Sequence, residues 1–163
     1  MTLRSLPVLL ALFLVGCTKT GREGEWLETT YSFTARSFGQ EKSETSRVKV
    51  KVAKSAIWKT GDKIVVFVLW QAENVDKVAM PYAWNNKHLM DGNGNFFSPE
   101  SGRNTPRLQP TETANPVPVR YVLPPTAMVD QLDWGWFDPD KKTLTYRIRL
   151  APQAVDHSPP EYF

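Results

Sequence analysis

Short stretches in which apolar and polar residues alternate recur along the chain. The clearest stretch covers residues 47–52, where Val48, Val50 and Val52 alternate with Arg47, Lys49 and Lys51. Successive side chains of a strand point to opposite faces of a sheet, so this alternation predicts a strand with one buried face. Similar alternation predicts strands within residues 31–36, 117–123, 132–137 and 144–150. The polar residues 38–46 are expected to form a loop.

The run from Lys63 to Gln71 is apolar on both faces. Ile64, Val66, Val68 and Trp70 lie on one face, and Val65, Phe67 and Leu69 lie on the other. A strand of this kind is typical of the covered centre of a sheet. A buried helix is the alternative for such a run, but its short length and its β-branched and aromatic residues favour a strand.

Turns and prolines divide the chain into short segments. Polar runs at residues 60–62, 91–95 and 138–141 contain glycine or proline and predict turns. The seven prolines between residues 99 and 125 exclude a long helix there, because proline cannot donate the backbone hydrogen bond. The seven or eight strands that remain predict an all-β fold, either an antiparallel β-sandwich or a barrel.

Composition limits the class of protein. The chain has 163 residues, 41% hydrophobic and 23% charged, which is typical of one globular domain. A single cysteine excludes an intramolecular disulfide framework and a cysteine-rich zinc site, and two histidines leave few candidates for a metal site. A formal net charge of +3 gives no strong attraction to nucleic acid, so we expect no nucleic-acid partner.

The beginning of the chain has the pattern of a processing signal. Arg4 precedes an apolar run over residues 6–15, which is too short to span a bilayer. The run ends in Leu-Val-Gly-Cys at residues 14–17, and this resembles the lipobox of bacterial lipoproteins. The resemblance implies that the Cys17 thiol takes a diacylglycerol, that the chain is cut just before it and that acyl chains hold the protein on a membrane. A plain secretory signal and a buried helix are the alternatives.

This interpretation divides the chain into four parts. Residues 1–16 are expected to be the signal peptide, 17–25 the lipidated cysteine and a tether, 26–150 the β-sandwich, and 151–163 a tail. In the sorting pattern of two-membrane bacteria, an Asp directly after the cysteine retains a lipoprotein in the inner membrane. Thr18 stands there instead. The resemblance therefore places the protein in the cell envelope, at the outer membrane facing the periplasm if the host is Gram-negative.

Four features follow one another in an order that resembles a known family. They are the apolar strand Lys63–Asn74, the hairpin Asp91–Phe97, the run Leu108–Thr113 and the strand Val119–Pro124. The third resembles Leu-x-Pro-Gly-Glu-Thr, with Thr111 where glycine is usual. Over roughly Val48 to Leu150 this order is similar to the telokin-like, immunoprotective-type extracellular domain of bacterial lipoproteins. The resemblance implies an immunoglobulin-like sandwich of seven or eight strands. It implies no activity, because that family has no agreed catalytic residues.

Motifs for catalysis or metal binding are absent from the sequence. Asp91, Asn93 and Asn95 have the oxygen spacing of a calcium loop, but Phe96 and Gly102 stand where that loop needs Gly and Glu, so we interpret the run as a turn. No nucleophile elbow and no phosphate-binding loop is present. We therefore expect no enzyme activity and no cofactor.

Two groups of residues are candidates for surface contacts. Trp134 and Trp136 lie on one face of a predicted strand, where they would either stack on sugar rings or fill the core, and the core is the preferred interpretation. Lys49, Lys51, Arg147 and Arg149, together with Arg47, would form one basic patch if their two strands were neighbours. A solvated strand face is the preferred interpretation of these residues.

The sequence thus predicts a lipid-anchored envelope protein that acts as a binding or scaffolding module. Its expected partners are the membrane, through acyl chains on Cys17, and an envelope protein or glycan. A protein that binds envelope glycan or lipopolysaccharide is one alternative, and an enzyme of unrecognised type is another.

Overall fold

All regular elements in the described part of the chain are strands. A computed structural model describes residues 18–80, 85–102, 107–151 and 155, without the side chains of residues 35–37. The strands are β1 (Lys19–Arg22), β2 (Leu27–Ser37), β3 (Gln40–Thr60), β4 (Lys63–Asn74), β5 (Lys87–Met90), β6 (Phe96–Phe97), β7 (Ser101–Gly102), β8 (Val117–Leu123), β9 (Asp133–Asp138), β10 (Thr143–Leu144) and β11 (Tyr146–Arg149). The predicted all-β class is confirmed. The predicted number of strands is too low, because strands as short as β6, β7 and β10 show no alternation.

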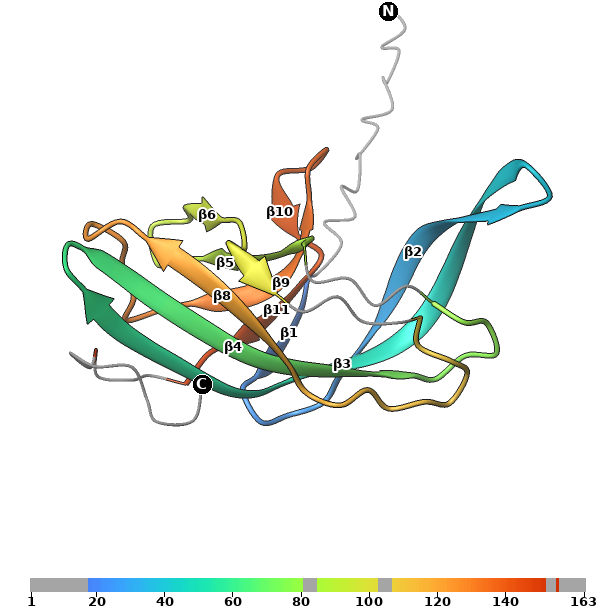
Figure 1. The fold of residues 1–163 in the computed structure, drawn as a ribbon, viewed down its shortest axis with the longest axis horizontal. Helices are drawn as coiled ribbons and strands as arrows, with labels where there is room; N and C mark the ends of the chain where they lie inside the picture. Colours follow the sequence, from blue (N-terminus) through green and yellow to red (C-terminus); the bar gives the residue numbers. More distant parts are fainter. Residues whose placement is uncertain (1–17, 81–84, 103–106, 152–154, 156–163) are drawn as a thin grey trace, which may run out of the picture.

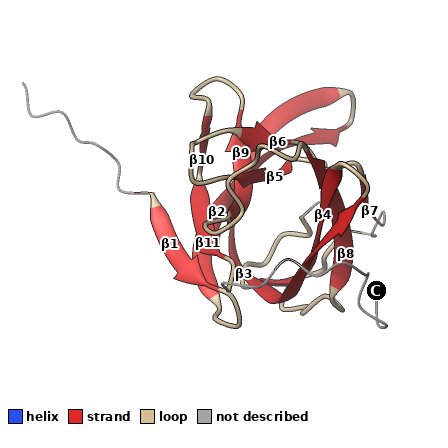
Figure 2. Ribbon diagram, turned by 90° about the vertical axis from the view of Figure 1, so that its left-hand side faces the viewer, coloured by secondary structure: helices blue, strands red, loops and turns tan. Residues whose placement is uncertain are grey.

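The strands form two sheets with the hydrophobic core between them (Figures 1 and 2). One sheet has the order β2-β3-β4-β8-β7 and is antiparallel throughout. The other has the order β1-β11-β9-β5-β6, with β10 beside β9. Its β1–β11 pair is parallel and its other pairs are antiparallel. The two-sheet architecture is the one that alternating strands predict, because each sheet must bury one face.

Strand β4 lies between β3 and β8, at the centre of its sheet. Its side chains Val66, Val68 and Trp70 are buried in the core between the sheets. On the opposite face Val65 packs with Ala56 and Trp58 in a second, smaller cluster. The predicted covered central strand is therefore confirmed, although Phe67 and Leu69 on this outer face are only half-buried.

Residues 38–46 do not form the loop that their polarity predicts. Strands β2 and β3 continue past the body and join at Phe38 and Gly39, whose φ angles are 50° and 78°. Two successive residues with positive φ are the geometry of a tight hairpin turn between twisted strands. We call residues 34–43 the hairpin arm, which projects from the body in Figure 1. The described side chains of this arm, at residues 34 and 38–43, are all exposed, in agreement with its polar composition.

The expected tether also contains regular structure. Residues Lys19–Arg22 form β1, which pairs with β11 in register Lys19 to Tyr146. The carboxylate of Glu23 then accepts hydrogen bonds from the backbone N–H of Ser55 (2.9 Å) and of Ala151 (2.9 Å), which fixes the end of β1. Only Thr18 separates β1 from Cys17. Cys17 itself, the signal segment and nearly all of the predicted tail lie outside the described residues.

Candidate functional site

A groove of about 390 Å³ opens between β2 and the turn that joins β9 to β10. Its lining residues are Thr30, Tyr31, Ser32, Trp136, Asp138, Pro139, Lys141 and Thr145. Three are aromatic or proline side chains, three are serine or threonine, and two are charged. Ligand sites in proteins have volumes in this range and combine an apolar surface with a few polar groups.

Two aromatic rings form the floor of this groove. Tyr31 comes from β2 and Trp136 from β9, and their ring centroids lie 3.9 Å apart with the planes tilted by 51°. The alternation along β9 turns Trp134 and Trp136 toward the same side, but Trp134 is fully buried while Trp136 lies nearer the end of the strand and is only half-buried. The groove therefore exposes part of an aromatic surface that otherwise belongs to the core.

A smaller cavity, lined in part by Lys87, shares residues with the groove. The space open to the centres of water molecules is about 20 Å³, enough for roughly one water. Tyr31, Trp136, Lys87 and Trp70 are among the residues that line this cavity, and Tyr31 and Trp136 also line the groove. Lys87 is on β5, directly opposite Trp136 in the register of β5 and β9.

Lys87 is a buried amine surrounded by aromatic rings. Its Nζ lies 4.2 Å from the ring centroid of Trp136, 5.1 Å from that of Trp70 and 5.9 Å from that of Tyr31. It donates a hydrogen bond of 2.8 Å to Oδ1 of Asn86. Burial lowers the pKa of Lys87 to about 7, because the ammonium loses its hydration. The aromatic faces offset part of that loss.

The neighbouring phenol is affected by the same burial. Burial raises the pKa of Tyr31 to about 12, and a hydrogen bond with the side chain of Asn86 opposes the rise. Tyr31 therefore stays protonated at neutral pH and supplies a neutral hydroxyl. Asn86 interacts with both Tyr31 and Lys87, which links the groove floor to the buried amine.

The rim of the groove is polar and is held by its own turn. The Asp138 carboxylate accepts hydrogen bonds from the backbone N–H of Asp140 (3.0 Å) and of Lys141 (3.1 Å). The pKa of Asp138 is lowered, mainly by the hydrogen bond from the backbone N–H of Lys141. The Nζ of Lys141 lies 3.5 Å from Asp138, and its side chain is largely exposed. The turn therefore presents a fixed carboxylate, paired with an exposed ammonium, at the edge of the groove.

Trp134 belongs to the core, as the preferred interpretation predicted, and offers no surface to a ligand. It is completely buried, and its Nε1 donates a hydrogen bond of 2.8 Å to the hydroxyl of Tyr121. The Tyr121 hydroxyl in turn donates to the backbone carbonyl of Lys87 at 2.9 Å. This buried chain fixes the backbone position of Lys87 from the opposite sheet.

The basic strands are not neighbours, so the condition for a joint patch is not met. Strand β3 carries Lys49 and Lys51, and β11, which carries Arg147 and Arg149, belongs to the other sheet. The segment after β1 lies between them, with Glu23 N–H donating to the Arg149 carbonyl and Gly24 N–H donating to Val52.

Most of these basic side chains have local partners. Lys49 lies 3.4 Å from Glu73, Arg149 pairs with Asp133, and Lys51 lies 5.7 Å from the ring centroid of Trp26. Arg147 sits opposite Thr20 of β1. Asp133 is buried, and Lys49, Lys51 and Arg147 are only half-buried, so the interpretation of a solvated strand face is met only in part. The partly exposed Lys49–Glu73 pair contributes at most about 1 kcal/mol.

The run 91–95 forms the predicted turn, between β5 and β6. The Asp91 carboxylate accepts hydrogen bonds from the backbone N–H of Asn93 (3.0 Å), Asn95 (2.9 Å) and Met128 (3.2 Å). Burial alone would raise the pKa of Asp91, but these bonds outweigh it and lower the pKa. His88 lies on the opposite face of β5 from the buried Lys87 and Leu89, and it stacks on Phe137 with ring centroids 4.5 Å apart.

Sequence reasoning identified Trp136 but missed Tyr31 and Lys87 as site residues. The period of two places Lys87 on the same face as Leu89, and Leu89 is fully buried, so the signal for an inward lysine was present. A lysine at the start of so short a strand is equally typical of a surface residue. The aromatic surroundings of Lys87 form only in the fold, where β2, β4 and β9 contribute the rings of Tyr31, Trp70 and Trp136.

In the described part of the chain, no helix has the length and apolarity needed to cross a bilayer. Comparison of the chain with models of protein families, with curated proteins and with solved structures found no match.

Proposed function

We propose that the protein is a lipid-anchored module of the bacterial cell envelope that binds a polar, saccharide-type ligand in the groove between β2 and the β9–β10 turn. The observation that carries the proposal is the half-buried ring of Trp136, packed on the buried ring of Tyr31, beside polar side chains of the groove. The role is binding rather than catalysis.

The groove has the chemistry that a sugar ring requires. Sugars present apolar C–H faces and a border of hydroxyl groups, so they pair well with an aromatic surface surrounded by hydrogen-bonding groups. The half-buried Trp136 supplies the surface, while Thr145, Asp138 and Lys141 supply hydroxyl, carboxylate and ammonium groups. The Nζ of the buried Lys87 contacts both rings, 4.2 Å from the centroid of Trp136 and 5.9 Å from that of Tyr31.

Anchoring through Cys17 is the second part of the proposal. It is supported by the lipobox resemblance and by the position of the only cysteine. Acyl chains on Cys17 would keep the domain at the outer membrane of a Gram-negative host, with the groove close to envelope glycan and lipid.

The immunoglobulin-like, telokin-like relationship belongs to the same proposal. Two facing sheets support it. Thr111 supports it further, because its φ is 60°, in the left-handed region that favours glycine, and the family motif has glycine there. The turn around Thr111 is closed by the Gln109 N–H, which donates to the Glu112 carboxylate at 2.7 Å.

A titration with soluble peptidoglycan fragments and with neutral oligosaccharides, followed by isothermal titration calorimetry, tests the groove. We expect saturable binding that weakens about two- to tenfold in Trp136→Ala, because loss of a stacking surface costs about 0.5–1.5 kcal/mol. Trp26→Ala is the matched control, since Trp26 is 40% exposed and lies outside the groove lining. Equal loss of affinity in both variants, or no saturable binding to any saccharide, would contradict the groove as the binding site.

A further inference from the structure

We propose that two copies of the chain associate through β2, whose free edges pair antiparallel about a twofold axis at Ser32. The inference goes beyond the proposed saccharide binding and does not rest on it. Four observations carry it: the length of the free edge, the direction of its backbone groups, the projection of the hairpin arm and the order of the residues on either side of Ser32.

The free edge of β2 is long and unprotected. In the described part of the chain β2 is the last strand of its sheet, and it has 11 residues. The other edge strands, β1, β6, β7 and β10, have only two to four residues. Long free edges normally carry lysine or proline, which discourage pairing with another chain, but neither residue type occurs in Leu27–Ser37. Strand β2 is therefore suited to accept a further strand.

The backbone groups that face this edge belong to the even-numbered residues of β2. Ser37 pairs with Gln40 across the two-residue turn, so these two residues exchange hydrogen bonds, and hydrogen-bonded pairs then alternate back along the hairpin. The N–H and C=O groups of Ser32 and its even-numbered neighbours therefore point away from β3. The Glu28 carbonyl agrees with this direction, because it accepts a hydrogen bond of 3.0 Å from Lys19 Nζ. A second strand would find a donor and an acceptor at every other residue.

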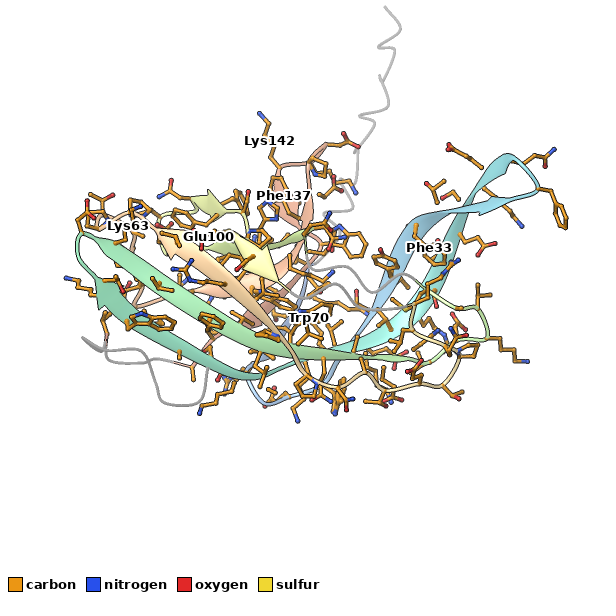
Figure 3. All side chains as sticks on the ribbon, in the orientation of Figure 1. Phe33, Lys63, Trp70, Glu100, Phe137 and Lys142 are labelled. Carbon is orange, nitrogen blue, oxygen red and sulfur yellow. The ribbon has the colours of Figure 1, made fainter. Side chains whose placement is uncertain are left out.

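The hairpin arm lacks the support that the rest of its sheet has. Strand β3 pairs with β4 only from Val48 onward, so residues 40–46 have only β2 beside them among the described strands. Figure 1 shows the arm projecting from the body, and Figure 3 shows Phe33 where the arm leaves it. A two-stranded hairpin is only marginally stable by itself in water. Pairing with a second copy would place the arm in a four-stranded segment and join the two five-stranded sheets into one continuous sheet.

The residues of β2 are self-complementary about Ser32. Ser32 is the midpoint of the strand, so an antiparallel pair centred there uses its whole length. In this register Glu28 takes the position opposite Arg36 of the second copy, so that an acidic residue stands opposite a basic one at two symmetric positions. Cross-strand pairs of opposite charge stabilise a sheet, and like charges destabilise it. Moving the axis by two residues in either direction places Glu28 opposite a neutral residue, so the charges favour the axis at Ser32.

Two exposed aromatic residues follow the same symmetry. Phe38 at the tip of the arm and Trp26 just before β2 each lie six residues from Ser32. Phe38 is fully exposed and Trp26 is 40% exposed. Burial of aromatic surface is favourable, and paired rings add to the gain. In the register about Ser32, Phe38 of each copy approaches Trp26 of the other, so association would cover both.

The second copy would also cover the groove. Thr30 and Ser32 line the groove, and in the proposed register they lie opposite Thr34 and Ser32 of the second copy. The arm of the second copy would therefore run along the edge at which the groove opens. The dimer and the saccharide-bound chain would exclude each other.

Cysteine cross-linking of the full chain in its native membrane tests the pairing. Ser32→Cys places two thiols on the axis, where the Cα atoms of a hydrogen-bonded antiparallel pair lie about 5.5 Å apart, within the range of a disulfide. We expect a disulfide-linked dimer after mild oxidation. Thr45→Cys is the matched control, because Thr45 is exposed and lies beside Ser32 in the same chain, but on β3. It should give no dimer, and neither should the wild type, which has only Cys17.

Two further measurements test the register. Differently tagged chains that carry Thr30→Cys or Thr34→Cys should cross-link to each other but not to themselves, because each position stands opposite the other. Glu28→Arg and Arg36→Glu should each weaken the dimer by about tenfold in sedimentation equilibrium of the full chain in detergent, because two pairs become repulsive at once. The double variant Glu28→Arg/Arg36→Glu should recover the affinity of the wild type.

Several results would overturn the inference. These are a monomeric wild type, equal cross-linking at positions 32 and 45, and a double charge variant that associates no better than the single ones. A cross-link from position 32 to a different protein would show that the edge accepts another partner, and it would overturn pairing with a second copy. These measurements contain no saccharide, so a negative result leaves binding in the groove to its own titration.

Discussion

Raising the pH from 7 to about 9.5 should increase the free energy of unfolding by about 3 kcal/mol, through Lys87 alone. The pKa of Lys87 is about 7 in the folded chain and 10.5 in the unfolded chain, so between these values the unfolded state binds more protons and stability rises with pH. Below pH 7 both states are protonated, and the full cost of burying the ammonium is present. Urea unfolding at several pH values measures the slope.

Lys87→Met separates this effect from other titrations. Methionine fills a similar volume without a charge, so the variant should lose the rise between pH 7 and pH 9.5 and should be more stable than the wild type at pH 7. Lys63→Met, at an exposed turn, should keep the rise. The upper limit of the window matters, because the raised pKa values of Tyr31 and Tyr121 make stability fall again above pH 10. A wild-type curve that is flat across the window would show that Lys87 is not buried as an amine.

Val68→Asp should abolish folding. Val68 is completely buried at the centre of β4, paired with Ser55 on β3 and Val119 on β8. A carboxylate there has no partner and costs several kcal/mol, against a total stability of about 5–15 kcal/mol for a domain. Circular dichroism and a thermal melt measure the outcome.

Leu69→Asp is the matched control for that variant. Leu69 is the next residue of the same strand, but its side chain lies half-buried on the outer face. We expect it to lower stability by about 1–2 kcal/mol and to leave a cooperative unfolding transition. A soluble Val68→Asp protein that melts cooperatively would contradict the placement of β4 in the core.

The alternation of apolar and polar residues predicted the layers of the fold but not its extensions. Burial decides the pattern of β4 and β8, so these strands could be located from the sequence. Residues 38–43 of the hairpin arm are exposed on both faces and therefore carry no such pattern, so the polar run 38–46 is typical of a loop. Strand β1 also shows no apolar alternation, because it is held by the backbone of β11 and by the Glu23 carboxylate rather than by an apolar face.

The candidate site was predictable only in part for a related reason. Trp136 was a candidate because two tryptophans alternate on one strand, but the sequence could not tell which of them the end of β9 leaves half-buried. Lys87 is recognised as unusual only from the rings of Tyr31, Trp70 and Trp136, which come from three different strands. The basic stripes failed as a joint patch because alternation fixes the face of a strand and not its neighbour in the sheet.

The central claim of a lipid-anchored module is tested most directly by labelling growing bacteria with a radioactive fatty acid and comparing the wild type with Cys17→Ser. The account predicts a labelled wild-type chain in the membrane fraction, shortened by cleavage before Cys17. It predicts an unlabelled Cys17→Ser chain that stays uncleaved or leaves the membrane. Equal labelling of both chains, or a wild type without label, would contradict the account.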